Sequence, residues 1–146
     1  MEGPDQLIRR ISDELEIRNL IARLAQCADR GDLEECGSLY TEDANWELRG
    51  QQGGPTIAPR RGRDDIITGS RERRASGAQG PGTHTRHIVA TTAVSVNGDT
   101  ATATSYLTFY KNTHKRPEIV MMTFYSDEFK RTPEGWKLSK RIMTQD

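Results

Sequence analysis

The sequence predicts an α+β domain in which N-terminal helices pack on a curved, mainly antiparallel sheet. Helical patterns are confined to the first half of the 146-residue chain, and four β-rich runs follow from residue 84 onward. Helices that precede consecutive strands indicate α+β organisation rather than a doubly wound fold. A chain of this length suits one core, so residues 1–146 are assigned to a single domain.

A long amphipathic helix is predicted over residues 5–28, because apolar side chains recur there at steps of three and four residues. Pro4 suits the first helical turn, and Gly31 can close the helix in the left-handed conformation. Asp32 is expected to cap a short second helix that reaches Tyr40. The apolar positions of the long helix are Leu7, Ile11, Leu15, Ile17, Leu20, Ile21, Leu24 and Ala28.

A short strand is predicted at 44–48, followed by a loop at 50–61 and a helix at 63–75. Residues 76–83 are rich in glycine and are predicted to form a connection. The β-rich runs that follow are joined by turns, which predicts an antiparallel meander. An Asn-Gly pair at 97–98 is a strong hairpin signal between the first two runs. The runs cover 86–96, 100–110, 118–131 and 136–143.

The charge balance and the two cysteines limit which partners and which cellular compartment are expected for the protein. The 21 Lys and Arg residues balance 21 Asp and Glu residues, which gives no reason to expect nucleic acid or an anionic membrane as partner. No apolar stretch reaches the length of a membrane span, and the N-terminus lacks a signal-peptide core. Cys27 and Cys36 are interpreted as two reduced thiols. A cytoplasmic protein is therefore expected.

Neither a metal nor another cofactor is expected, because His84, His87 and His114 do not form a metal-binding pattern. One basic cluster stands out, and it is interpreted as a solvated helix face diluted by acidic neighbours. Binding of an acidic substrate or of RNA is the weaker alternative, since no aromatic residues interleave with these arginines. The cluster consists of Arg60, Arg61, Arg63, Arg71, Arg73 and Arg74.

Short motifs lie in a fixed order along nearly the whole chain. They occupy residues 16–20, 28–32, 39–44, 62–66, 84–87, 125–129 and 135–138, with an arginine at 141. In this order and spacing they resemble the SnoaL-like branch of the nuclear transport factor 2-like superfamily. The resemblance implies a cone-shaped α+β barrel with one hydrophobic pocket.

Within that branch the chain is similar to the scytalone dehydratases and hexachlorocyclohexane dehydrochlorinases, which eliminate water or HCl from small apolar rings. The resemblance implies a His–Asp pair made by Asp29 and His87, together with an arginine at Arg141. The chain departs from the dehydrochlorinases at Leu24, where they carry a lysine, and those enzymes have longer C-termini.

Proton abstraction beside a leaving group needs a base that titrates near working pH, and histidine suits this role. Asp29 would fix the tautomer of His87 and stabilise its imidazolium, if the fold brings them together. The alternatives are local hydrogen bonding at a helix end and a satisfied strand histidine. His84 is expected at the rim. Arg141 either orients a substrate oxygen or is a surface cation beside Asp127.

Most large apolar side chains are expected in the core, with some lining the pocket, because ligand sites are mainly apolar with a few polar groups. For one of the adjacent residues Met121 and Met122, the alternative is a position in the core without contact to a ligand. For Tyr40, the alternative is a buried packing role. The candidates for substrate binding are Tyr40, Trp46, Tyr106, Met121 and Tyr125.

The sequence therefore favours a cofactor-independent lyase of the dehydratase or dehydrohalogenase kind, or an isomerase. Its substrate is expected to be a small, largely apolar cyclic or polyketide-like molecule. The alternative is a non-catalytic small-ligand-binding or assembly module of the same fold. The resemblance also implies a homo-oligomer, either trimer or dimer, and the 50–61 and 76–83 loops are candidate lids.

Overall fold

The computed structural model describes residues 1–50 and 57–145, so the middle of the predicted 50–61 loop lies outside the described residues. Three helices and six strands occur in the described residues, and the four predicted β-rich runs are the last four strands. The elements are α1 (Pro4–Arg30), α2 (Leu33–Ser38), β1 (Tyr40–Arg49), β2 (Arg60–Arg61), α3 (Arg63–Ala75), β3 (Arg86–Asn97), β4 (Thr100–Lys111), β5 (Glu118–Thr132) and β6 (Gly135–Thr144).

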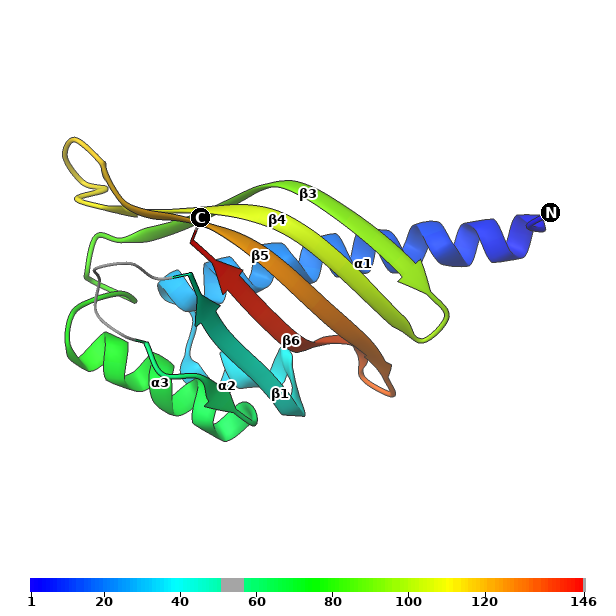
Figure 1. The fold of residues 1–146 in the computed structure, drawn as a ribbon, viewed down its shortest axis with the longest axis horizontal. Coiled ribbons are helices and arrows are strands. Elements are labelled where there is room, and N and C mark those ends of the chain that lie inside the picture. The colour runs from blue at the N-terminus through cyan, green and yellow to red at the C-terminus, as the bar shows by residue number, and fades with distance from the viewer. Residues whose placement is uncertain (51–56, 146) are drawn as a thin grey trace.

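The strands form one curved sheet in the order β2-β1-β6-β5-β4-β3 (Figure 1). The predicted meander is confirmed, because β3 to β6 pair antiparallel in succession. β1 adds to the sheet parallel to β6, which the sequence did not indicate. A bulge between Ala90 and Ala93, with Thr91 at a φ of 54°, interrupts the register of β3. The sheet is curved into the predicted cone but does not close into a full barrel.

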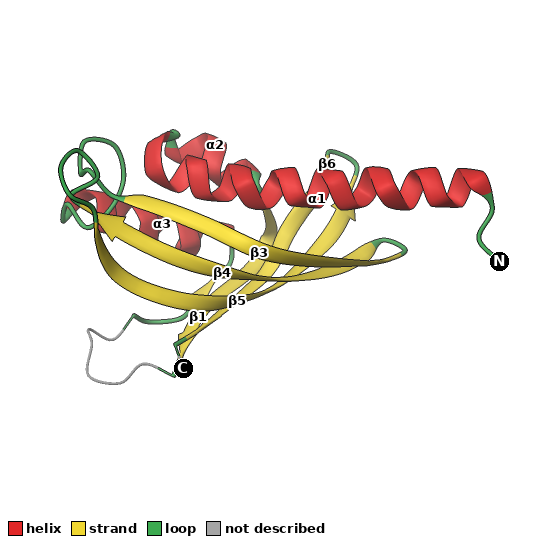
Figure 2. Cartoon of the chain, turned by 90° about the horizontal axis from the view of Figure 1, so that it is seen from above, coloured by secondary structure: helices red, strands yellow, loops and turns green. Residues whose placement is uncertain are grey.

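Helix α1 lies along one face of the sheet, and its N-terminal part extends beyond the sheet (Figure 2). From Ile17 onward its apolar face is buried against β3, β4, β5 and β6, with Phe129 and Leu138 almost fully enclosed. The prediction that Leu7 and Leu15 belong to the same buried face is wrong. Their side chains are 41% and 58% exposed. Leu15 lies between Asp13 and Ile17, which are both buried, so the stripe that carries these two leucines faces away from the sheet. The same holds for Ile11, which is 47% exposed.

The end of α1 is joined to α2 by a disulfide between Cys27 and Cys36, so the interpretation of these residues as reduced thiols is wrong. The tight turn at Gly31 and Asp32 brings the two Cα atoms to 5.6 Å. Gly31 is extended rather than left-handed, with φ −81° and ψ 166°. Its lack of a side chain matters because a Cβ there would lie 2.5 Å from the Cys27 sulfur. With the thiols paired, they no longer support a reducing compartment.

Helices α2 and α3 cover the β1 end of the molecule (Figure 1). The predicted cap is confirmed, since the Asp32 carboxylate accepts a hydrogen bond from the Glu35 N–H at 2.7 Å. The second helix is shorter than predicted, because it ends at Ser38 and Tyr40 already belongs to β1. None of the described helices is long and apolar enough to cross a membrane.

Candidate active site

The centre of the candidate site is a contact between the end of α1 and the start of β3. The Asp29 carboxylate lies 2.7 Å from Nδ1 of the His87 ring. The backbone N–H of His87 also donates to both Asp29 carboxylate oxygens, at 3.2 Å each. One residue on the strand therefore holds the carboxylate at two points. This fixes the direction in which the imidazole faces.

The His87 ring is further held by Phe109 on β4, whose ring centroid is 4.6 Å away. A carboxylate beside Nδ1 favours the tautomer that carries its proton there. The remaining nitrogen, Nε2, has no hydrogen-bond partner among the described residues. The His87 side chain is 14% exposed, so the ring is mostly enclosed yet reachable. In a neutral ring with its proton on Nδ1, Nε2 would be the nitrogen available to accept a proton.

A second polar group lies deeper in the sheet. Arg141 on β6 donates from Nε and Nη2 to the Asp127 carboxylate on β5, both at 2.8 Å, and the Asp127 side chain is fully buried. Burial alone would lower the pKa of Arg141, but the charge and hydrogen bonds of Asp127 outweigh burial and raise that pKa. The Arg141 guanidinium also lies 4.0 Å from the centroid of the Tyr125 ring. Arg141 is thus a buried, paired cation rather than a surface cation.

Two tyrosines accompany this ion pair. Burial raises the pKa of Tyr125 to about 12, although the nearby Arg141 acts in the opposite direction. Burial likewise raises the pKa of Tyr40. Asp29 also acts on the pKa of Tyr125, so Tyr125 lies near both polar groups. Both phenols therefore remain neutral near pH 7 and can donate hydrogen bonds.

Apolar side chains surround these groups on the inner face of the sheet. The buried members are Leu107, Phe109, Tyr125 and Met143. Trp46 and Met121, both predicted to bind substrate, pack against them. The structure thus brings six predicted residues into one region of the molecule: Asp29, His87, Arg141, Tyr125, Trp46 and Met121.

The model of the SnoaL-like domain family matches residues 9–142 of the chain. The chain belongs to the SnoaL-like domain family. It therefore has the cone-shaped fold of the nuclear transport factor 2-like superfamily, as the short motifs predicted. No curated protein sequence matches the chain significantly.

Solved structures agree with this family. An NTF2-like protein with a cystatin-like fold from Novosphingobium aromaticivorans is 28% identical, with a TM-score of 0.78 over 99% of this chain and 90% of that chain. A proposed aromatic ring hydroxylase from the same organism is 27% identical, with a TM-score of 0.72 over 92% and 89%. A proposed dehydratase of the NTF2-like family from Streptomyces avermitilis is 19% identical, with a TM-score of 0.71 over 92% and 97%, and shows the fold alone.

Tyr106 of this SnoaL-like domain, which was predicted to bind substrate, lies on the outer face of the sheet, apart from the Asp29–His87 contact. Its neighbours Ser105 and Leu107 are buried, and strand alternation therefore turns Tyr106 to the outer face, where it is 51% exposed. There its ring contacts Phe124, with centroids 5.7 Å apart. Strand periodicity alone could not show which of the two faces is the inner one.

His84 lies outside β3, in a turn with a φ of 55°, and its exposed ring stacks on His114 with centroids 3.8 Å apart. It is therefore not part of the Asp29–His87 contact. Among the described residues, no group of three or more His, Cys, Asp or Glu side chains could hold a metal ion.

The interpretation of the basic cluster as a solvated helix face is wrong for several of its members. Arg63 donates to the Tyr40 carbonyl at 2.7 Å, and Arg74 donates to the Cys27 carbonyl at 3.0 Å. Arg73 lies over the Trp46 ring, with its Cζ atom 5.4 Å from the centroid. A run of charges in a sequence does not show which side chains turn inward. The sequence therefore did not indicate Arg73 as a site residue, nor Asp127 as the buried partner of Arg141.

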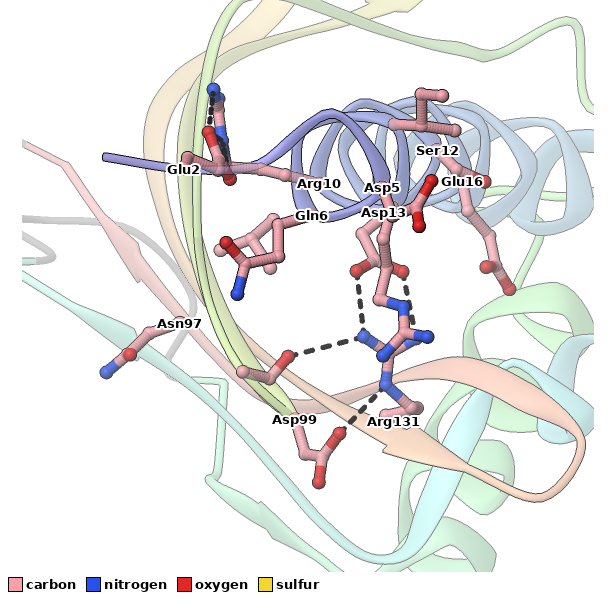
Figure 3. Close-up of a pocket in the computed structure, with 14 residues that line it drawn as sticks. Glu2, Asp5, Gln6, Arg10, Ser12, Asp13, Glu16, Asn97, Asp99 and Arg131 are labelled. Atoms are coloured by element: carbon pink, nitrogen blue, oxygen red, sulfur yellow. Dashed lines mark hydrogen bonds and ion pairs between the residues drawn. The ribbon is translucent and has the colours of Figure 1, made fainter.

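Two surface hollows lie away from this site. The larger, about 1060 Å³, lies between the first half of α1 and the β3–β4 hairpin. At its wall Arg131 reaches from β5 to Asp13 on α1 and to Asp99 (Figure 3). The smaller, about 530 Å³, lies between α2 and α3. Neither is lined by Asp29 or His87, so the predicted apolar pocket beside them stays a prediction.

Proposed function

We propose that this SnoaL-like domain is a cofactor-independent lyase or isomerase in which His87 removes a carbon-bound proton. The hydrogen bond of 2.7 Å between Asp29 and the His87 ring carries the proposal. It supplies what a general base needs, which is a fixed tautomer with one free ring nitrogen. The Asp29 carboxylate would also stabilise the imidazolium that forms after proton transfer.

The proposed step begins with a neutral His87 whose Nδ1–H donates to Asp29. Its Nε2 lone pair takes a proton from the carbon next to the one that bears the leaving group. The electrons of that C–H bond form the new double bond, and the leaving group departs with its bonding pair. In an isomerase, the imidazolium would instead return the proton to another carbon of the same molecule.

A small cyclic substrate of largely apolar character suits the side chains near His87. Phe109, Tyr125 and Trp46 offer flat apolar surfaces, and Met121 adds an adaptable side chain. A proposed aromatic ring hydroxylase among the structural neighbours fits this substrate class.

Arg141 is the proposed group that polarises a substrate oxygen or leaving group, together with the neutral hydroxyl of Tyr40. Its Nε and Nη2 atoms bond Asp127, which leaves Nη1 available for a substrate. Because Asp127 holds the guanidinium rigidly, such a donor would be preorganised rather than recruited.

Exchange of carbon-bound hydrogen for deuterium tests the proposal even while the product is unidentified. Cyclic ketones and cyclic β-hydroxy ketones would be incubated in D₂O with the protein, and exchange next to the carbonyl followed by NMR. Elimination and isomerisation both require this proton transfer. We expect His87→Ala to slow exchange by about 100-fold or more. His84→Ala is the matched control, because His84 is an exposed histidine outside the contact.

Exchange in His87→Ala as fast as in the native protein would exclude His87 as the base. Exchange no faster than in protein-free D₂O with the native protein would favour the second candidate, a non-catalytic small-ligand-binding or assembly module. The outer face of the sheet supports assembly, because Ile88, Tyr106 and Met122 expose 47%, 51% and 62% of their surface there. A homo-oligomer formed through this face stays a proposal, which light scattering on the purified protein would test.

A further inference from the structure

Arg73 on α3 is a half-buried cation with an unusual set of partners. Its guanidinium lies over the face of Trp46, 5.4 Å from the ring centroid. Its Nη2 donates to the neutral hydroxyl of Ser70 at 3.2 Å. Among the described residues, no carboxylate lies within ion-pair distance of it. Most of its hydrogen-bond donors therefore lack an acceptor there.

Each of the other arginines that are buried or half-buried in the described chain makes two hydrogen bonds, although the Nε atoms of Arg60 and Arg74 have no partner there. Arg141 pairs with a buried carboxylate, and Arg60 pairs with two carboxylates on α3. Arg63 and Arg74 donate to backbone carbonyls. Arg73 makes a single hydrogen bond, to a hydroxyl, and its other contact is an aromatic ring. Like Arg63 and Arg74, it has no carboxylate partner in the described chain. A partly desolvated cation without a counter-charge costs free energy unless an anion joins it.

The position of Arg73 connects it to the candidate site. Trp46, beneath the guanidinium, packs against the apolar residues that include Phe109, and the Phe109 ring contacts His87. Tyr40 and Tyr125 also lie close enough to act on the pKa of Arg73, which burial lowers. These contacts connect Arg73 to His87 through Trp46 and Phe109.

We propose that Arg73 binds the carboxylate of a small cyclic carboxylic acid. A guanidinium presents a planar fork of N–H donors that matches a carboxylate, and its stacking on Trp46 holds that plane in place. The apolar side chains beyond Trp46 would receive the ring. This inference rests on the proposed function for the location of the reacting carbon, but the binding of the anion can be measured without turnover.

The test compares two probes that share one shape, 2-naphthoate and 2-naphthamide, by isothermal titration calorimetry. The native protein is expected to bind the carboxylate at least about tenfold more tightly than the amide. Arg73→Gln should remove this preference, and Arg73→Lys should keep part of it. Arg71→Gln is the matched control, because Arg71 is an exposed arginine on the same helix and should leave the preference unchanged.

A second readout locates the probe. Binding of 2-naphthoate should shift the NMR signal of the Trp46 indole N–H and leave that of Trp136 in place. Circular dichroism of Arg73→Gln and Arg73→Lys checks that both variants are folded. An equal affinity for the two probes, no binding of either probe, or a preference that persists in Arg73→Gln overturns the proposal.

His87→Ala separates the two proposals. If the preference for the carboxylate persists in this variant while deuterium exchange disappears, both proposals are supported. If the preference depends on Arg73 but exchange does not depend on His87, the anion site stands and the catalytic role of His87 falls. If exchange depends on His87 but the two probes bind equally, Arg73 is excluded and the base is retained.

Discussion

Two aspartates on α1, Asp13 and Asp29, lie about 24 Å apart along the helix axis and hold different kinds of partner. Asp13 accepts two hydrogen bonds from Arg131 at 2.8 Å and one from the Trp136 indole at 3.0 Å. All its partners are permanent donors. Asp29 instead holds one residue, His87, through the backbone and the ring.

The difference teaches how one helix serves stability at one end and chemistry at the other. Hydrogen bonds from Arg131 lower the pKa of Asp13 despite its burial, so the carboxylate is an ionised part of the scaffold. The partner of Asp29 can itself gain and lose a proton, and its Nε2 has no partner among the described residues. The contact of Asp13 uses only groups that are already paired with it, whereas the contact of Asp29 leaves Nε2 of His87 available to a substrate.

The largest expected effect is on catalysis. Asp29→Asn should slow deuterium exchange by about 100-fold or more, because an amide neither enforces the reactive tautomer nor stabilises the imidazolium. Asp13→Asn should leave the exchange rate of the folded protein unchanged. NMR measures the exchange rates of both variants. A slower rate in Asp13→Asn than in Asp29→Asn would contradict the assignment of chemistry to Asp29.

The next largest effect is on stability, and here Asp13 rather than Asp29 is expected to matter more. Asp13→Ala should lower the free energy of unfolding by about 2–3 kcal/mol, because it leaves Arg131 and the Trp136 indole without their acceptor. The estimate is below that for a fully buried pair, since the Arg131 side chain is 34% exposed. Urea denaturation followed by circular dichroism measures the change. A loss below about 0.5 kcal/mol would show that the Asp13 network is not structural.

The disulfide next to Asp29 supports the shape of the helix end. Replacing Cys27 and Cys36 together by serine should cost about 2–3 kcal/mol, since the bond closes a short loop in the unfolded chain. Urea denaturation of the double variant measures this cost. Reduction of the native protein should produce a similar loss, and no loss from either treatment would contradict the pairing.

A smaller effect is expected on the stability of the protein at low pH. The folded state binds a proton at Asp13 less readily than the unfolded chain does, because hydrogen bonds from Arg131 lower its pKa from 3.8. The stability from this group is therefore present above pH 3.8 and is lost as the pH falls below that value. Asp13→Asn should reduce the slope of stability against pH in that range. An unchanged slope would exclude Asp13 as its source.

The smallest expected effect lies on the outer face. Tyr106→Ser should change deuterium exchange less than twofold, because the ring points away from His87. Tyr125→Phe is the inner-face counterpart on β5, where removal of a buried hydroxyl should slow the reaction more. Rates of both variants, measured side by side, would test which face of the sheet carries the chemistry.

Local patterns predict most of the architecture. Hairpin and turn signals place β3 to β6, and the Asp32 cap places α2, because these features depend on neighbours in the chain. The parallel pairing of β1 with β6 depends on residues far apart in sequence, so no local pattern indicates it. Ile11 is exposed because its stripe of the helix faces away from the sheet, and helical periodicity alone does not show which stripe packs on the sheet.

The site divides in the same way. Motif order points to Asp29 and His87, and the fold brings them into hydrogen-bond contact. Arg73 stands in a run of arginines that the sequence groups as solvated, because its inward orientation depends on how α3 packs on β1. Periodicity leaves the face of Tyr106 open, since only the direction of sheet curvature decides between the two faces. The disulfide escapes prediction because two cysteines alone do not show that a turn brings them together.

The most direct test of the central claim is the protonation pattern of the His87 ring, read from long-range ¹⁵N–¹H correlations with His87→Ala for assignment. The account predicts a neutral ring that carries its proton on Nδ1, facing Asp29, and has a bare Nε2. Asp29→Asn should abolish this preference. A native ring that is protonated on Nε2 and bare at Nδ1 would contradict the proposed base.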